Sequence, residues 1–263
     1  TSGGNDRISG NDGDDLLRAG AGDDHVYGDA GDDKIVGGSG LGDDVYDGGS
    51  GTDLVTYDSA TAGILVDLAS GLATSLSTDA QIGTDALTAI ESVIASQFDD
   101  QLVGDHHNNW FKGGLGNDEI DGGGGIDTVL YDETAARIVG GEATISVLGD
   151  RLTNIERIEF ADQGIALDLA GSAGLTAKTL VAVIGQAGLS NREYVSVGLQ
   201  LFDAGQSLER VCELALTAVG ATSHADVVTT LYTNLYGEAP SDEQLQTYVE
   251  LLDDGVFTKG PLA

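Results

Sequence analysis

Apolar side chains recur with a period of about nine residues along the first 56 positions, in a stretch that is otherwise rich in glycine and aspartate. An aspartate stands two residues before each apolar residue, and a glycine stands two residues before each aspartate. The apolar residues in this phase are Ile8, Leu17, Val26, Ile35, Tyr46 and Val55. A disordered Gly/Asp linker would explain the composition but not the shared phase of three residue types, so the pattern predicts a folded repeat.

Each unit predicts a six-residue turn followed by a three-residue strand. Glycine allows the positive φ angles and the close approach of chains that such turns need. Two units then form one coil of a solenoid, and stacked coils bury a continuous apolar seam. Two extra residues lie between Asp33 and Asp44, within residues 38–42. We expect them to bulge from one turn, with Asp44 still in phase with Asp24 and Tyr46 still pointing inward.

The nine-residue phase stops after Thr56 and resumes in a second, weaker block. The second block places Leu102, Phe111, Ile120 and Val129 at inward positions. Between the blocks, strand-like runs at residues 64–68 and 90–94 are expected to continue or cap the solenoid. Both blocks end in a Tyr-Asp pair followed by a strand-rich segment, and the two segments parallel each other. The sequence therefore predicts a duplicated module.

From Leu175 onward the apolar period becomes helical, and we expect a compact domain of four or five short helices. The predicted helix starts are a capping box at Ser190 and Glu193, then Ser207, Ser223 and the pair Pro240-Ser241. The predicted fold class is mainly β, a parallel β-roll (β-solenoid) followed by a small all-α domain. The predicted divisions are 1–58 for the first repeat block, 59–97 for a strand-rich connecting or capping segment, 98–132 for the second block, 133–169 for a strand-rich cap and 170–263 for the helical domain.

Charge and cysteine content limit the class of protein. The chain has 44 acidic and 11 basic residues, and 33 of the acids lie in residues 1–168, where the repeats are. Such a charge disfavours nucleic acid and anionic membrane surfaces as partners and opposes compaction unless cations bind. No stretch approaches the roughly 18 apolar residues of a membrane span. The single Cys212 excludes an intrachain disulfide framework and is expected to be a buried, unreactive thiol. The chain starts inside a repeat without a signal-peptide pattern, which suggests a piece of a longer protein.

Aspartates in stacked glycine-rich turns favour calcium binding. The aspartate of each turn is expected to face that of the turn two units on, beside exposed main-chain carbonyls. Calcium prefers six to eight hard oxygen ligands, so the turns predict on the order of four to seven Ca²⁺ ions. The predicted ligands are Asp6, Asp15, Asp24, Asp33, Asp44, Asp53, Asp100, Asn109, Asp118 and Asp127. Asn109 is expected to be the weakest of them because it carries no charge.

These units resemble the RTX (repeats-in-toxin) calcium-binding nonapeptide family over residues 1–58 and, in part, over residues 98–132. In the second block, Phe98 and His107 stand where the family repeat has glycine, and Asn109 stands where it has aspartate. Residues 226–237 also resemble a helical domain of the DUF4214 type, which is often appended to RTX repeats.

The resemblance implies a calcium-binding, calcium-dependent folding module of an extracellular or cell-surface protein of a Gram-negative bacterium. It also implies export in an unfolded state by the type I secretion machinery, with folding on calcium outside the cell. Our first hypothesis is a surface-layer or adhesin-type structural protein with no enzymatic activity, whose partners are cell-surface polysaccharide or further copies of itself. The alternatives are the C-terminal tail of a secreted protease, lipase or epimerase whose catalytic domain lies outside this chain, and a pure export and folding device.

Other chemistries fit the sequence less well. Residues 37–42 lack the βαβ context of a dinucleotide loop and would place phosphates among carboxylates. His106 and His107 with Asp105 could bind zinc, but neighbouring side chains of a strand point to opposite faces, so a turn position on the roll surface is favoured. No Ser/His/Asp arrangement has a nucleophile-elbow context, and calcium ligation already accounts for the carboxylate pairs that a glycosidase would need. Neither proline follows an aspartate, so the Asp-Pro bond of self-cleaving RTX modules is absent.

Overall fold

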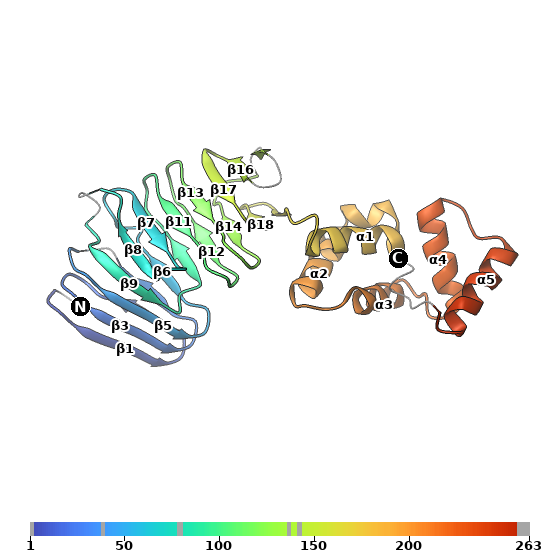
Figure 1. The fold of residues 1–263 in the computed structure, drawn as a ribbon, viewed down its shortest axis with the longest axis horizontal. Helices are drawn as coiled ribbons and strands as arrows, with labels where there is room; N and C mark the ends of the chain where they lie inside the picture. Colours follow the sequence, from blue (N-terminus) through green and yellow to red (C-terminus); the bar gives the residue numbers. More distant parts are fainter. Residues whose placement is uncertain (1–2, 38–39, 78–80, 136–137, 141–143, 257–263) are drawn as a thin grey trace. The chain divides into compact units, whose positions relative to one another are not determined.

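The computed structural model describes residues 3–37, 40–77, 81–135, 138–140 and 144–256. The chain forms two compact units, Thr1–Leu167 and Asp168–Ala263. In the described parts of the chain, the first unit contains the strands and the second contains the α-helices (Figure 1). The predicted fold class, a parallel β-roll followed by a small all-α domain, is confirmed.

The first unit consists of two sheets, and the chain alternates between them along the repeats. Sheet A has eleven strands, in the spatial order β1 (Arg7–Asp12), β3 (His25–Ala30), β5 (Val45–Ser50), β9 (Thr84–Thr88), β8 (Leu72–Ser75), β7 (Ile64–Asp67), β11 (Gln101–Val103), β13 (Glu119–Asp121), β17 (Asp150–Thr153), β16 (Thr144–Val147) and β15 (Val139–Gly140). Sheet B has eight strands, in the order β2 (Leu16–Arg18), β4 (Lys34–Val36), β6 (Leu54–Thr56), β10 (Ser92–Ile94), β12 (Trp110–Lys112), β14 (Thr128–Leu130), β18 (Arg157–Glu159) and β19 (Gly164–Ala166).

Neighbouring coils pair in parallel, with their apolar residues in register. In sheet A, Ile8 pairs with Val26, and Val26 pairs with Tyr46. Tyr46 is fully buried, so the two-residue insertion before it leaves the register intact, as the sequence predicts. Of the expected bulge, residues 38–39 lie outside the described residues, and Leu41 is 72% exposed. Burial of each inward side chain contributes about 1.5–3 kcal/mol to the seam.

The connecting segment inserts unequally into the two sheets. In sheet A, β9, β8 and β7 lie between β5 and β11, and β8 is antiparallel to both of its neighbours. In sheet B, β10 alone lies between β6 and β12. Since strands are about 4.8 Å apart, the two additional strands lengthen sheet A by about 10 Å relative to sheet B. The strands consequently fan out along this unit (Figure 1).

The second strand-rich segment repeats this arrangement and ends the roll. Strand β17 pairs in parallel with β13, and β16 and β15 follow it in antiparallel pairing. In sheet B, β18 extends the stack and β19 pairs antiparallel with it. The predicted module is therefore present twice in the structure.

The second unit contains α1 (Ser172–Ile184), a 3-10 helix (Gln186–Ser190), α2 (Arg192–Asp203), α3 (Leu208–Ala218), α4 (His224–Tyr236) and α5 (Asp242–Asp253). Its core includes Val183, Leu216, Val227, Leu231 and Leu252. No helix in the described residues is long and apolar enough to cross a membrane.

Three of the four predicted helix starts are confirmed, and one is wrong. Ser207, Ser223 and Ser241 are the N-caps of α3, α4 and α5. Asn191 caps α2 in place of Ser190, because Ser190 closes the preceding 3-10 helix while Asn191 accepts two main-chain N–H bonds. Cys212 is fully buried and burial raises the pKa of its thiol, in agreement with an unreactive cysteine.

Candidate metal centre

The predicted ligands lie in turns at two positions along each coil. Asp6, Asp24, Asp44, Asp100 and Asp118 lie in turns that lead into sheet A, and Asp15, Asp33, Asp53, Asn109 and Asp127 lie in turns that lead into sheet B. All except Asp6 and Asp15 are buried. We call these two columns of stacked residues the A ladder and the B ladder.

Within each ladder, one carboxylate oxygen accepts a hydrogen bond from the main chain of the preceding coil. Oδ1 of Asp24 accepts from the N–H of Asp6 at 2.7 Å, and Oδ1 of Asp33 accepts from that of Asp15 at 2.8 Å. Oδ1 of Asp53 accepts from the N–H of Asp33 at 2.8 Å. The same bond joins Asp24 to Asp44, Asp100 to Asp118 and Asn109 to Asp127. The turns two units apart therefore stack as the repeat phase predicts.

The second carboxylate oxygen of several ladder aspartates is buried and meets no protein donor. Among the described residues, this holds for Oδ2 of Asp24, Asp33, Asp53, Asp118 and Asp127. Burying a carboxylate oxygen without a partner costs free energy, so these oxygens favour the binding of a cation. Hard carboxylate oxygens are the ligands that Ca²⁺ prefers.

In the B ladder, a carbonyl oxygen converges with this free oxygen beside a glycine. A β-carbon on Gly28 would lie 2.2 Å from Oδ2 of Asp33 and 2.3 Å from the carbonyl oxygen of Gly48. At Gly122 the same contacts are 2.5 Å to Oδ2 of Asp127 and 2.2 Å to the carbonyl oxygen of Asn154. Glycine is required here because two oxygens occupy the space of a side chain. The residues present therefore fit a bound calcium ion.

Burial also shifts the acidity of the ladder. Desolvation raises the pKa of Asp118 and of Asp127 to about 7, and neighbouring carboxylates add to the shift. Desolvation raises the pKa of Asp100 to about 6 and that of Asp53 above its ordinary range. A bound cation would oppose both causes, since it favours the charged carboxylate.

Four acidic residues that the sequence analysis missed end the ladders. Asp85 and Asp150 accept from the N–H groups of Asp44 and Asp118 in the A ladder. Glu91 and Glu156 do the same for Asp53 and Asp127 in the B ladder. A sequence signal was available, because both pairs belong to a duplicated Asp-x-Leu-Thr-x-Ile-Glu motif at 85–91 and 150–156.

Tyrosine hydroxyls occupy the second oxygen where the A ladder ends. Tyr57 donates to Oδ2 of Asp85 at 2.9 Å, and Tyr131 donates to Oδ2 of Asp150 at 2.8 Å. These are the tyrosines of the two Tyr-Asp pairs that end the repeat blocks. Protein donors therefore replace the cation at these positions.

Three predicted ligands are already engaged by protein donors. Tyr46 donates to Oδ2 of Asp44 at 2.6 Å. Ser96 donates to both oxygens of Asp100. The side-chain oxygen of Asn109 accepts from the N–H of Asp105 at 2.8 Å. The free oxygens of the other buried aspartates make them the stronger candidates for calcium ligation.

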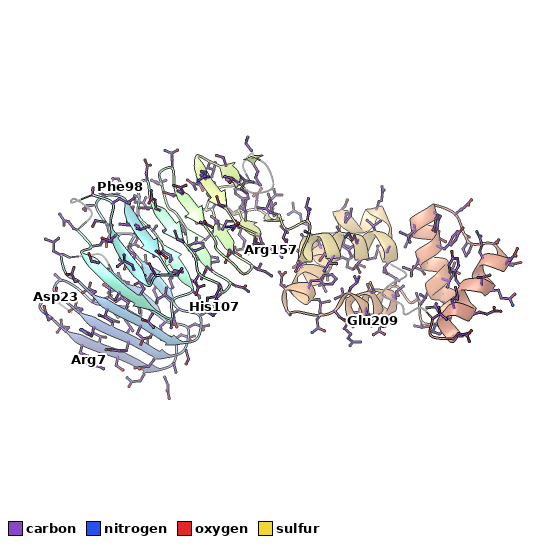
Figure 2. All side chains as sticks on the ribbon, in the orientation of Figure 1. Arg7, Asp23, Phe98, His107, Arg157 and Glu209 are labelled. Carbon is purple, nitrogen blue, oxygen red and sulfur yellow. The ribbon has the colours of Figure 1, made fainter. Side chains whose placement is uncertain are left out.

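A second set of contacts, also missed, ties the coils together at the surface. The residue before a ladder aspartate accepts the N–H of the equivalent residue in the next coil. Asp14 accepts from Asp32 at 2.9 Å, and Asp23 (Figure 2) accepts from Asp43 at 3.1 Å. Asp32 in turn accepts from Thr52 at 2.8 Å. Consecutive coils are thus hydrogen-bonded in both directions, which keeps the turns stacked at a fixed spacing.

Comparison with known families agrees with this geometry. Residues 1–35 and 94–129 match the RTX calcium-binding nonapeptide repeat, in four copies. A search of curated proteins found no match to the chain. The chain therefore carries RTX calcium-binding repeats, a module of secreted bacterial proteins that binds several Ca²⁺ ions. The likeness of the helices to a DUF4214-type domain stays a prediction.

Proposed function

We propose that this chain is a calcium-dependent folding module, without catalytic activity of its own, from a surface-layer or adhesin-type protein exported by a type I system. The observation that carries the calcium-dependent part is the set of buried carboxylate oxygens that meet no protein donor. Bound calcium supplies the positive charge that these oxygens need. The chain's own residues position the oxygens, through the N–H bonds of the ladders and the glycines beside them.

The energy balance of one repeat supports a folding switch. Each unit buries only one inward apolar side chain, whereas all nine of its residues must be ordered against backbone entropy. Stacked carboxylates add repulsion. Calcium bound only by the folded state offsets the difference, and its contribution grows with calcium concentration. The roll would then stay unfolded at low cytosolic calcium and fold outside the cell.

The ladder assignment is tested by counting bound ions in matched variants. Asp33→Asn removes a carboxylate charge from the B ladder, at a residue whose Oδ2 is buried without a protein donor. Asp47→Asn also removes one carboxylate charge, but from β5, outside both ladders. Native mass spectrometry should show the loss of at least one Ca²⁺ from Asp33→Asn and none from Asp47→Asn. Equal calcium counts in the two variants would remove the support for Asp33 as a ligand.

The structural role is tested by binding. In calcium, the purified chain should sediment with Gram-negative cell envelopes or assemble with itself, and both should reverse on chelation. The chain would instead be the tail of a secreted enzyme if it stays monomeric, does not bind cell envelopes and follows a protease, lipase or epimerase domain in its parent protein.

A further inference from the structure

One turn of the B ladder departs from the calcium-binding pattern. In residues 104–109, His107 replaces the glycine of the repeat and Asn109 replaces its aspartate. The side chain of Asn109 is engaged at both ends, because its oxygen accepts from Asp105 N–H and its Nδ2 donates to the carbonyl of Glu91 at 3.4 Å. This turn therefore offers no free carboxylate at the ladder position.

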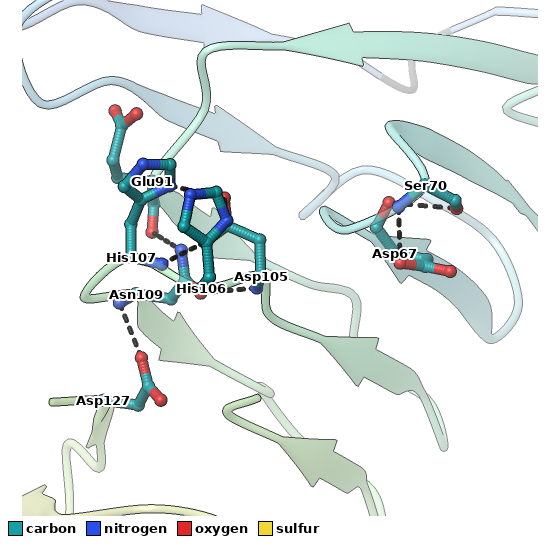
Figure 3. Close-up of polar contacts among 8 residues, drawn as sticks. All are labelled: Asp67, Ser70, Glu91, Asp105, His106, His107, Asn109 and Asp127. Atoms are coloured by element: carbon teal, nitrogen blue, oxygen red, sulfur yellow. Dashed lines mark hydrogen bonds and ion pairs between the residues drawn. The ribbon is translucent and has the colours of Figure 1, made fainter. Parts of the chain in front are cut away.

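The same turn brings two imidazoles and a carboxylate together (Figure 3). Nδ1 of His107 lies 2.6 Å from Oδ2 of Asp105, and Nδ1 of His106 lies 3.8 Å from the same oxygen. The two ring centroids are 3.8 Å apart. The turn position on the roll surface is as the sequence predicts, but the objection that the two histidines point to opposite faces is wrong. They lie in a bend and not in a strand, so both rings gather beside Asp105.

We propose that Asp105, His106 and His107 bind a divalent transition-metal ion of the zinc class. Imidazole nitrogen and carboxylate oxygen are ligands that zinc prefers, whereas calcium takes oxygen ligands. One atom from each of the three residues lies within 4.8 Å of the others. Three protein ligands leave further coordination positions to water or to a group from another molecule.

Rotation of the two rings can bring the ligand atoms to zinc distances. With bonds of about 2.0–2.2 Å, two ligands of a tetrahedral zinc ion lie about 3.4 Å apart. The 2.6 Å and 3.8 Å separations bracket this value. The side chains of His106 and His107 are 83% and 59% exposed, so their rings can rotate without disturbing the core. Asp105 is held in place from the other side, because its Oδ1 accepts the N–H of His107 at 2.8 Å.

The Asp105 carboxylate already faces nitrogen groups of this turn. Its Oδ1 accepts from the main-chain N–H of His107, and its Oδ2 lies beside the ring Nδ1 of the same residue. Without a metal, an exposed contact between histidine and a carboxylate contributes little to stability. A contribution to stability therefore does little to explain why two histidines stand in this turn.

The test is a zinc titration of the whole chain in saturating calcium, with a chromogenic zinc chelator as competitor. Excess calcium occupies the ladders, so the zinc binding that is measured comes from this turn. We expect one zinc ion per chain, bound at least tenfold more weakly by His107→Gln or Asp105→Asn. His25→Gln, which removes an exposed histidine from β3, should bind as the wild type does.

A repair variant keeps the proposal falsifiable if single substitutions disturb folding. His107→Gly with Asn109→Asp restores the ordinary repeat, and circular dichroism checks that it folds. It should lose the zinc ion and gain one calcium ion in native mass spectrometry. The proposal is overturned if the wild type binds no zinc, or if His107→Gln and the repair variant bind zinc as tightly as the wild type. Because the wild-type calcium count is measured separately, failure here leaves the calcium ladders untouched.

Discussion

Replacing Gly28 with alanine tests whether the oxygens that converge in the B ladder are needed. The φ angle of Gly28 is not in the left-handed region, so alanine suits its backbone. The added β-carbon would lie 2.2 Å from Oδ2 of Asp33 and 2.3 Å from the carbonyl oxygen of Gly48. Comfortable contact between such atoms is about 3.5 Å, so each oxygen must move away by about 1.2–1.3 Å. The effect of the substitution is therefore steric and falls on a single position in the ladder.

Two contributions set the size of the effect. Overpacking a well-packed site costs about 1–3 kcal/mol. Loss of one calcium ion that is present at a hundred times its dissociation constant removes about 2.7 kcal/mol more. The calcium-loaded Gly28→Ala protein should therefore lose about 4–6 kcal/mol of unfolding free energy.

The assay is urea unfolding in saturating calcium, followed by circular dichroism. Gly124→Ala is the matched control, because its φ is likewise not left-handed and its β-carbon would meet nothing closer than the Cα of His106 at 3.9 Å. The control should change the unfolding free energy by less than about 0.5 kcal/mol. If Gly28→Ala is as stable as the control and binds as many calcium ions, the convergence of oxygens at Gly28 has no role in binding.

Two further predictions concern the buried carboxylates. Tyr57→Phe removes the hydroxyl that donates to buried Asp85, so it should lower the free energy of unfolding, measured in urea, by about 1–3 kcal/mol. The control Tyr27→Phe, on the surface, should lower it by well under about 1 kcal/mol. An unchanged Tyr57→Phe protein would mean that the tyrosine does not satisfy Asp85. In calcium-free protein, folding raises the pKa of Asp85, Asp118 and Asp127 to about 7 from an ordinary 3.8, mainly by burial. Because the folded state holds these protons more tightly than the unfolded state, protonation stabilises the fold. This contribution is fully present below pH 3.8 and is lost as the pH rises through about 7. Calcium-free protein should therefore show more β signal at about pH 5 than at about pH 8, and a β signal that falls on acidification would contradict the shifts.

The repeats could be predicted from sequence because the residues within each unit determine the structure of that unit. Glycine and aspartate specify the turn, the apolar residue specifies the inward face, and the constant spacing fixes the register. This is why the pairing of Val26 with Tyr46 across an insertion was predictable. The buried position of Asp33 and its bond to Asp15 follow from the same spacing.

The connecting segment was harder, because its pairing depends on distant residues. An apolar alternation predicts a strand over residues 64–68 but not that β8 would pair antiparallel between β7 and β9. Asp85 completes the A ladder from 41 residues beyond Asp44, so no local spacing connects the two. Comparing the two Asp-x-Leu-Thr-x-Ile-Glu motifs with each other would have found it.

The histidine turn was misjudged for a local reason. His106 and His107 would point apart in a strand, but glycine-rich repeats place this position in a turn. Once the residues are aligned with the repeat, their place between Gly104 and Asn109 puts them in the turn portion. Sequence alone could give that position but not the approach of both rings to Asp105.

The central claim is that calcium supplies the free energy that folds the roll. The most direct test is circular dichroism and small-angle scattering of the whole chain before and after calcium removal by a chelator. The account predicts loss of the β signal and expansion of the chain, retention of the helical signal, and recovery of the β signal when calcium is restored. A β signal and a radius that stay unchanged in excess chelator would contradict it.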